Sequence, residues 1–368
     1  MDVRTLHRFP CTTCGSDLRF SPGTNVLLCD HCGSEQVIEG APELADPPIV
    51  ERGYLQALCN ELPQAETSEI HVITCENCGA HVEFEPENHA TECPFCATPV
   101  VTNTGSERQI KPSALLPFGM AEQEARKRMT DWLGKLWFAP GGLQEYARKG
   151  RKMQGIYVPY WTYDADTKSN YSGQRGTIYY VTQKVSVMVD GKSRMQDKQV
   201  QKIRWTQARG RVARFFDDVL VLGSRSLPKS YTDALAPWDL SELEPYHPEY
   251  LAGFRAEGYT VSLEEGFKEA TDYMNRMINR DVRFDIGGDR QRIGNIDTKV
   301  SRQTFKHILL PVWLAAYKYR GKTYRFVVNG RNGTVRGERP YSAIKIAAAV
   351  IAGLCIAAAI GYLIATNG

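Results

Sequence analysis

The sequence predicts an α+β protein with two N-terminal four-cysteine zinc ribbons, a mixed antiparallel-sheet and helix domain, and one C-terminal transmembrane helix. Three observations predict this class: a repeated arrangement of cysteines, alternating strand-like and helix-like segments in mid-chain, and twenty uncharged residues near the end. The 368 residues provide enough length for more than one unit, since domains usually have about 100–200 residues. We expect ribbons at 1–40 and 71–101, linkers at 41–70 (with a short helix) and 102–112, an α+β domain at 113–340 and the membrane anchor at 341–366.

Two stretches of the chain carry the same pattern of two Cys-x-x-Cys pairs separated by fourteen residues. The second repeats the first at an offset of 64 residues, so we interpret them as an internal duplication. Gly15 and Gly79 follow the first pair of each stretch, where a tight turn favours glycine. Four thiolates complete the tetrahedral shell of structural zinc. We therefore predict two structural zinc ions, one held by Cys11, Cys14, Cys29 and Cys32 and the other by Cys75, Cys78, Cys93 and Cys96.

Other roles for these cysteines fit the pattern less well. A thioredoxin-like redox site needs one Cys-x-x-Cys pair beside a βαβ unit, and a catalytic zinc site keeps one ligand position open. The N-terminus lacks the apolar segment of a signal peptide, which agrees with thiols in a reducing compartment. Four histidines lie near the cysteines, but four thiolates already complete each metal shell. We interpret these histidines as solvated or packing side chains: His31, His71, His81 and His89.

The net charge of +3 hides a strong difference between the two ends of the chain. Residues 1–101 contain four Arg and no Lys against sixteen Asp or Glu, a net charge of −12. The remainder carries 41 basic and 26 acidic residues, a net charge of +15. Residues 71–101 have five Glu and no basic residue. Because binding to phosphate depends on Lys and Arg, we expect the ribbons to bind protein rather than nucleic acid.

The run IAAAVIAGLCIAAAIGYLIA, residues 346–365, has the length that a helix needs to cross a bilayer. The preceding residues 301–345 hold ten basic residues and one acid, Glu338. By the positive-inside rule this charge places the N-terminal domains in the cytoplasm, so we predict a single-pass protein of the inner (plasma) membrane. A buried alanine-rich helix of a soluble core is the alternative.

Small residues recur at four-residue intervals along one face of this helix: Ala349, Gly353, Ala357 and Gly361. Such spacing lets helix backbones approach closely in lipid, so we expect this face to support a homo-oligomer. Half of the twenty residues are Ala or Gly, however, and chance also produces such a row.

Two amphipathic helices are predicted between the ribbons and the tail. One lies near residues 119–138, and the other begins at Ser262, which forms a Ser-x-x-Glu capping box with Glu265. We expect both apolar stripes to pack in the core. The stripes are Ala125, Met129, Trp132, Leu133, Leu136 and Trp137 in the first helix, and Leu263, Phe267, Ala270, Met274, Met277 and Ile278 in the second.

The remaining segments of this domain have the composition of strands. Residues 157–163, 177–181 and 185–189 are rich in aromatic and β-branched residues, with Asp190-Gly191 as a hairpin turn. Residues 307–337 predict an antiparallel meander with Asn-Gly turns, and its apolar stretch of nine residues is too short to cross a membrane. We expect a buried strand there.

Enzymatic motifs are absent from the sequence, and we predict a non-enzymatic protein. Two Gly-Lys-Ser/Thr triplets lack the earlier glycine of a phosphate loop. Asp217 and Asp218 have the chemistry to hold a metal, but adjacent carboxylates point to opposite faces of a strand, so we expect an exposed loop or strand end. Five aromatic residues form a cluster that has the chemistry to bind a ligand, although such residues are more often buried in the core: Tyr157, Tyr160, Trp161, Tyr163 and Tyr171.

Four strings in the chain, KPSALLPFG (111–119), LWFAP (136–140), residues 155–176 and residues 309–342, resemble a bacterial family of membrane-anchored double zinc-ribbon proteins. Its members are often labelled primosomal protein N′ or replication factor Y helicase. The resemblance covers nearly the whole chain. It implies a cytoplasmic domain tethered to the inner membrane, with flotillin-like (SPFH) and phage-shock-protein-A-like proteins as partners. Helicase activity is not expected, since the chain lacks a phosphate loop.

These observations together predict a tail-anchored scaffold that recruits protein partners through its acidic ribbons. The basic domain then lies against anionic lipid, where each Lys or Arg near the surface contributes about 1 kcal/mol. The alternative is a membrane-tethered nucleic-acid-binding protein that uses the basic domain. An unrecognised enzyme built on the two aspartates and the aromatic cluster is a further alternative.

Overall fold

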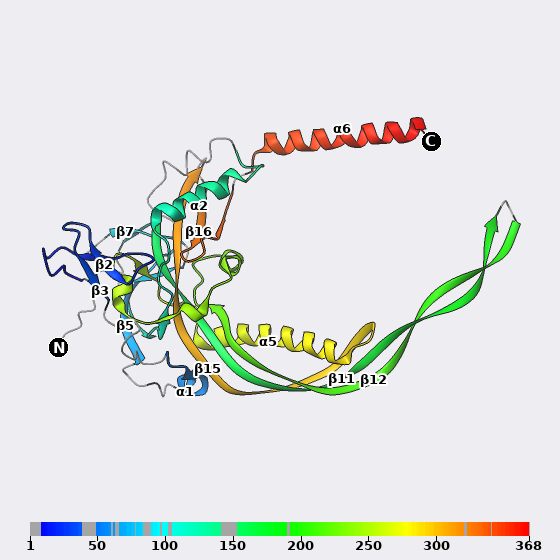
Figure 1. Ribbon diagram of the computed structural model, residues 1–368, viewed down its shortest axis with the longest axis horizontal. Coiled ribbons are helices and arrows are strands. Elements are labelled where there is room, and N and C mark those ends of the chain that lie inside the picture. The colour runs from blue at the N-terminus through cyan, green and yellow to red at the C-terminus, as the bar shows by residue number, and fades with distance from the viewer. Residues whose placement is uncertain are drawn as a thin grey trace.

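The structure, a computed structural model, describes residues 9–38, 49–59, 62, 66–77, 79–83, 90–95, 98–101, 105–140, 153–189, 192–319, 322–339 and 341–367. Its centre is a mixed sheet, which has nine strands within these ranges (Figure 1). The main strands follow the order β12 (Lys192–Leu222), β11 (Gln154–Val189), β15 (Arg290–Tyr319), β10 (Ala114–Leu115) and β13 (Glu244–Pro245). Four more strands join them: β14 (Arg255–Ala256) beside β11, β4 (Arg52–Gly53) and β16 (Lys322–Asn329) beside β15, and β17 (Val335–Gly337) beside β16.

Helices and two smaller groups of strands surround this sheet. The longer helices are α2 (Glu122–Gly134), α5 (Leu263–Ile286) and α6 (Ala343–Asn367), and α1 (Tyr54–Leu58) and α4 (Lys229–Thr232) are short. The first cysteine stretch forms β1 (Leu18–Phe20), β2 (Val26–Cys29) and β3 (Glu35–Val37). The second contributes β5 (Thr67–Thr74), β6 (His81–Glu83), β7 (Ala90–Glu92), β8 (Pro99–Val101) and β9 (Gly105–Ile110). Helices combined with antiparallel sheets confirm the α+β class.

Three strands are much longer than the sequence predicts. β11 is continuous over 36 residues, so the prediction of separate strands at 157–163, 177–181 and 185–189 is wrong. The residues between them have turn-like composition, yet they pair with β12 on one side and with β15 on the other. Register shifts at Tyr163/Ala165 and Ser172/Gly173 let the strand bend without ending. The neighbouring strands thus override local propensity.

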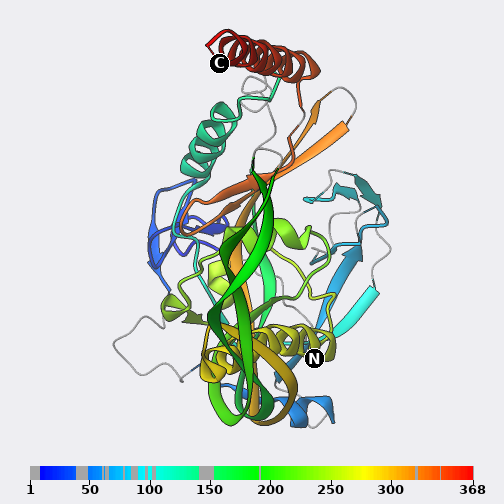
Figure 2. The ribbon, with the colours of Figure 1, turned by 90° about the vertical axis from the view of Figure 1, so that its right-hand side faces the viewer.

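The two longest strands continue beyond the body as a projecting ribbon (Figures 1 and 2). The pairing of β11 with β15 ends at Gly176↔Arg290, whereas its pairing with β12 continues to Val189↔Lys192. We call residues 177–189 and 192–204 the arm. The predicted turn at Asp190-Gly191 lies outside the described residues, between the last paired positions of the arm.

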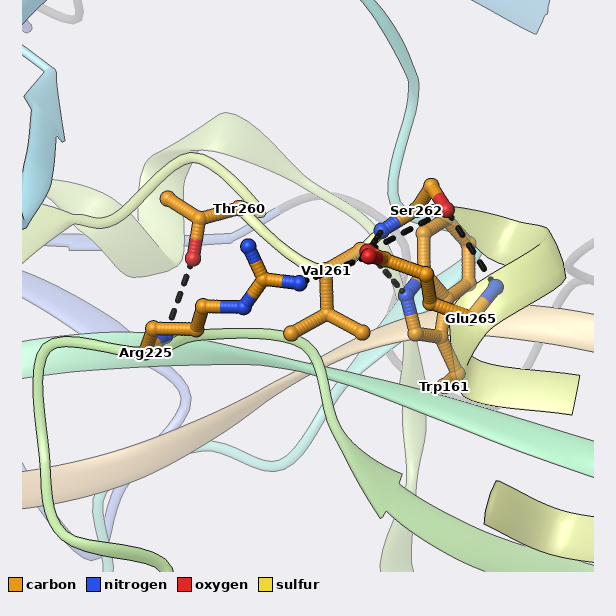
Figure 3. A network of polar contacts seen from close by, with 6 residues as sticks. All are labelled: Trp161, Arg225, Thr260, Val261, Ser262 and Glu265. Atoms are coloured by element: carbon orange, nitrogen blue, oxygen red, sulfur yellow. Dashed lines mark hydrogen bonds and ion pairs between the residues drawn. The ribbon is translucent and has the colours of Figure 1, made fainter. Parts of the chain in front are cut away.

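Helix α5 crosses the part of the sheet between the body and the arm (Figure 1). Its predicted start is confirmed, because Ser262 accepts from the backbone N–H of Glu265 and the Glu265 carboxylate accepts from the N–H of Ser262 (Figure 3). The indole of Trp161 donates to the carbonyl of Val261 at 2.9 Å, which fixes this end of the helix on β11. Arg225, from the loop after β12, pairs with the Glu265 carboxylate at 2.7 Å.

The buried face of α5 follows the predicted stripe, and Phe267 and Met277 are partly buried beside it. A glycine sets the closest approach: a Cβ added to Gly266 would lie 2.4 Å from the hydroxyl oxygen of Tyr163. That hydroxyl donates to the carbonyl of Leu263 at 2.8 Å. The predicted aromatic cluster is accordingly core, since Tyr157, Tyr160, Trp161, Tyr163 and Tyr171 are all buried.

Helix α2 is shorter than the predicted span of 119–138. It ends at Gly134, and a turn over residues 135–140 follows. Ala125, Met129 and Leu133 are buried as expected, but Trp137 is 79% exposed, so its assignment to the core stripe is wrong. The short helix expected in the 41–70 linker is α1, which has five residues.

Asp217 and Asp218 occupy an irregularity inside β12 rather than a loop or strand end, so that prediction is wrong. Asp217 is exposed, while Asp218 adopts a positive φ of 49° and turns its carboxylate to the ammonium of Lys306 at 2.7 Å. Buried Asp164 accepts from the N–H of Asp218 at 2.6 Å and lies 3.9 Å from the same ammonium. The carboxylate of Glu51, from the linker between the ribbons, is a third neighbour of Lys306, at 3.1 Å. These groups form a structural ion cluster.

Helix α6 contains an apolar segment of 21 residues, Ala343–Leu363, that is long enough to cross a membrane and is 0% buried within the protein. The helix extends away from the body (Figure 1). A buried alanine-rich core helix, the alternative, does not fit this exposure. Added Cβ atoms at Gly353 and Gly361 would meet open space, so the face of small residues has no neighbour among the described residues.

The ion cluster predicts a large effect of removing its cation. In Lys306→Met the buried Asp164 carboxylate loses its counter-charge, and we expect the free energy of unfolding to fall by about 3–5 kcal/mol in chemical denaturation of the detergent-solubilised protein. Lys299→Met, at an exposed position of the same strand, serves as the control and should change it by less than about 0.5 kcal/mol. Equal effects in the two variants would contradict a structural role for the cluster.

A second prediction concerns His307, which is buried and whose Nδ1 contacts the carbonyl oxygen of Ile110 at 2.7 Å. Burial lowers the pKa of His307 to about 4, whereas an unfolded histidine titrates near pH 6.5. Below pH 6.5 the unfolded chain therefore binds a proton that the folded protein does not, and about 3 kcal/mol of stability is lost as the pH falls to 4. Denaturation of wild type and His307→Gln between pH 7 and pH 4 measures this, and equal pH slopes would refute it.

Candidate metal centre

The first cysteine stretch folds into two tight turns that face each other. In the first turn the N–H of Gly15 donates to the carbonyl of Cys11 at 2.8 Å, and in the second the N–H of Gly33 donates to that of Cys29 at 2.9 Å. Both glycines have positive φ, 77° and 75°, a conformation that favours glycine. The glycine role was predicted for Gly15, whereas the equivalent role of Gly33 was missed. β1 and β2 connect the turns as an antiparallel pair.

The turns bring the four sulfurs together as predicted. The Sγ atoms of Cys11, Cys14, Cys29 and Cys32 all lie within 4.8 Å of one another. The Sγ–Sγ distance is 3.6 Å between Cys11 and Cys32 and 3.5 Å between Cys14 and Cys29. Thiolates bound tetrahedrally at about 2.3 Å from zinc are about 3.8 Å apart. The four cysteines thus form a candidate metal site whose dimensions fit one zinc ion.

A hydroxyl beside the sulfurs assists ionisation of two of the four thiols, those of Cys11 and Cys32. The Oγ of Ser34 lies 2.9 Å from the Sγ of Cys11 and 3.2 Å from that of Cys32. The hydrogen bond of Ser34 lowers the pKa of the Cys11 thiol to about 5 and also lowers that of Cys32. Because thiolate is the form that binds metal, Ser34 favours the ligand state. Cysteine spacing alone gave no sign of this residue.

The first ribbon is joined to the central domain. Cys11 and Cys29 are buried in the same apolar cluster as Phe118 and Trp313 of the body. Phe20 is fully buried and packs edge-to-face on Tyr250 with a centroid separation of 5.1 Å. Backbone hydrogen bonds reinforce the contact, from Phe20 N–H to Ala252 O at 3.0 Å and from Gly23 N–H to Phe118 O at 2.8 Å.

The described part of the second ribbon repeats the same hydrogen bonds. The N–H of Gly79 donates to the carbonyl of Cys75 at 2.7 Å, and the N–H of Cys93 donates to that of Thr98 at 2.9 Å, as Cys29 does to Ser34. Cys75 and Cys93 are both buried. The remaining predicted ligands, Cys78 and Cys96, lie outside the described residues.

The second ribbon contacts a different part of the domain from the first. Cys75, Cys93 and Phe95 belong to an apolar cluster that includes Leu116 and Ile156 of the body. The N–H of Gly258, beside β14, donates to the carbonyl of His81 at 3.0 Å. Both ribbons therefore pack against the domain of their own chain, a relationship that the sequence left open.

The predicted non-ligand histidines fit this description where they are visible. His31 is exposed and His81 is partly buried. The four sulfurs of the first site need no nitrogen ligand. The His71 side chain and all of His89 lie outside the described residues.

Comparison with known proteins gives one informative match. The chain is 25% identical over 345 residues to the uncharacterized protein YdjG of Bacillus subtilis (strain 168), a similarity that covers 92% of each chain. No protein-family model matches the chain, and no solved structure matches it. The similarity extends over most of the length of both chains.

The metal site predicts that a buried ligand supports both the ion and the core. In Cys29→Ser we expect about one fewer zinc per chain by elemental analysis and a lower melting temperature, because Cys29 packs with the body. Cys59→Ser is the matched control, since Cys59 is an exposed thiol outside both quartets. Unchanged zinc content in Cys29→Ser, or the same loss in Cys59→Ser, would refute the assignment.

Proposed function

We propose that the protein is a non-enzymatic, tail-anchored scaffold at the cytoplasmic face of the bacterial inner (plasma) membrane. The observation that carries this proposal is α6, an apolar helix without protein cover, attached to a domain that packs two cysteine ribbons on its surface. Apolar surface of this extent is stable only in lipid or against another protein. The ten basic residues of 301–345 support a cytoplasmic location for the body.

We further propose that both ribbons hold zinc. For the second ribbon, the 64-residue repeat and the repeated hydrogen bonds of Gly79 and Cys93 support the same cage. Its ligands would be Cys75, Cys78, Cys93 and Cys96. The zinc ions act as structural supports, because four thiolates leave no position for a substrate.

Protein partners fit the ribbons better than nucleic acid does. The exposed side chains of the first ribbon include the acids Asp17 and Glu35 and the apolar Val37, which is 62% exposed. Exposed acidic and apolar side chains suit a basic or amphipathic protein surface. The resemblance to double zinc-ribbon proteins supplies the candidate class, flotillin-like or phage-shock-protein-A-like membrane-stress proteins.

Capture from membranes tests the scaffold role. Tagged full-length protein should recover such partners from solubilised membranes, and Cys75→Ser/Cys78→Ser should lose them because the second cage no longer forms. Cys59→Ser should behave as wild type. Unchanged recovery by the double variant would contradict docking through this ribbon, and appearance of the wild type in the soluble fraction after ultracentrifugation would contradict the anchor.

The arm favours a second candidate function. Residues 192–214 of β12 contain eight basic residues and one acid, Asp197. Two of the eight, Arg209 and Arg211, are exposed on the body side of the arm. Such a stripe is the electrostatic footprint of a nucleic-acid-binding surface. Gel shifts with the protein in lipid nanodiscs decide: retardation of DNA or RNA that weakens steeply with salt supports this function, and no retardation at low salt excludes it.

A further inference from the structure

The turn that follows α2 exposes an aromatic side chain at an informative place. Trp137 is 79% exposed, and its neighbour Phe138 is 37% exposed. Single exposed apolar residues are ordinary on protein surfaces. The position of this pair distinguishes it, because the turn lies at the base of α6, where the helix leaves the body (Figure 1).

Two hydrogen bonds attach the turn to the first turn of α6. The N–H of Ser342 donates to the carbonyl of Phe138 at 2.8 Å, and the Lys345 ammonium donates to the carbonyl of Ala139 at 2.8 Å. The backbone beside Trp137 is therefore held at the start of the apolar segment. Wherever that segment begins relative to a bilayer, Trp137 is at nearly the same depth.

The residues just before α6 have the same character. Tyr341 is 59% exposed, and the Arg339 guanidinium lies over its ring, 5.1 Å from the centroid. Trp and Tyr are enriched at the membrane–water interface because one end is apolar and the other polar, and nearby cations pair with headgroups. Aromatic and basic side chains thus surround the point at which α6 begins.

The length of α6 places this group at the interface. The apolar segment Ala343–Leu363 has 21 residues and is about 31 Å long at 1.5 Å per residue, close to the hydrocarbon thickness of about 30 Å. If the segment spans this layer, Tyr341 and the turn of Trp137 lie at its cytoplasmic edge. With the apolar segment matched to the hydrocarbon layer, the rings of Trp137 and Tyr341 lie at the level of the headgroups rather than in bulk water.

We propose that Trp137, Phe138 and Tyr341 form an interfacial collar that inserts into the headgroup region of the bilayer crossed by α6. The inference rests on the proposed membrane insertion of α6 and adds a second contact of the body with lipid. Its role is to fix the depth of the body at the membrane surface. Coverage of the collar by a second copy of the chain or by another protein would contradict this proposal, and the test below detects it.

Site-specific photocrosslinking tests the collar in the full-length protein in vesicles of phosphatidylethanolamine and phosphatidylglycerol. p-Benzoylphenylalanine replaces Trp137, Phe284 or Ile351 in separate variants, and lipid adducts are quantified by mass spectrometry. Phe284 is the matched control, because it is 90% exposed on α5. Ile351 in α6 reports insertion of the helix itself.

We expect abundant lipid adducts at 137 and 351 and few at 284. Adducts at 351 with no excess at 137 over 284 would overturn the collar and leave the anchor standing. Absence of adducts at 351 would overturn the anchor and the collar together. Protein adducts in place of lipid at 137 would also overturn the proposal by showing a protein neighbour.

A fluorescence measurement supplies an independent readout without an unnatural residue. Brominated lipids quench indoles at the interface, so the quenched emission should be smaller in Trp137→Phe than in wild type. Trp205→Phe is the control, since Trp205 lies on β12 under the guanidinium of Arg292. Equal quenching in wild type and Trp137→Phe would contradict the collar.

Discussion

The alternation of side chains along β11 and β15 is the constraint on which the rest of the structure depends. Within one short stretch, Tyr157 belongs to the cluster that contains Cys11 and Cys29, while Ile156 and Val158 belong to the cluster that contains Cys75 and Cys93. Successive residues of a strand point to opposite faces. The two ribbons therefore cover opposite faces of one sheet. Duplication of the ribbon has a structural reason: a sheet that is apolar on both faces needs a cover on each.

A metal ion at the first site would act through this packing. A ribbon of about thirty residues is too small to fold on a hydrophobic core of its own and needs metal or a neighbour for stability. The first ribbon has a neighbour and a candidate metal site, since buried Cys29 is at once a candidate ligand and a member of the same apolar cluster as Leu115. Loss of an ion bound there would disturb the cover on one face of the sheet as well as the ribbon. Folding of the body and metal binding would then be coupled.

Local patterns in the sequence were reliable where the physical cause is local. The cysteine spacing placed four sulfurs, and the Ser262–Glu265 capping box placed the start of α5. Features set by distant partners were missed. Residues 164–176 look like a loop until β12 and β15 flank them. The Lys306 cluster joins residues from four separate segments, and Trp137 leaves the predicted stripe because α2 ends three residues before it. No local window contains these contacts.

The arm restricts how the body meets a bilayer. In Figures 1 and 2 the arm and α6 extend from the body toward the same side. The arm has 13 residues on its first strand, about 43 Å at 3.3 Å per residue. If α6 crossed a bilayer along the membrane normal without any change in the body, the arm would also lie inside the bilayer. The arm carries Lys198, Lys202 and Arg204, and its outer strand edges are unpaired in the described chain.

Neither charges nor open strand edges are stable in hydrocarbon. Insertion of α6 therefore requires its axis to turn relative to the arm. Hydrogen bonds join the turn of Trp137 to the first turn of α6, and Ala139 of the same turn is buried in the core of the body, so the start of α6 is attached to the body. If α6 crosses a bilayer, the change in direction would then lie within α6 beyond its first turn or in the arm, where, among the described residues, β11 and β12 pair only with each other.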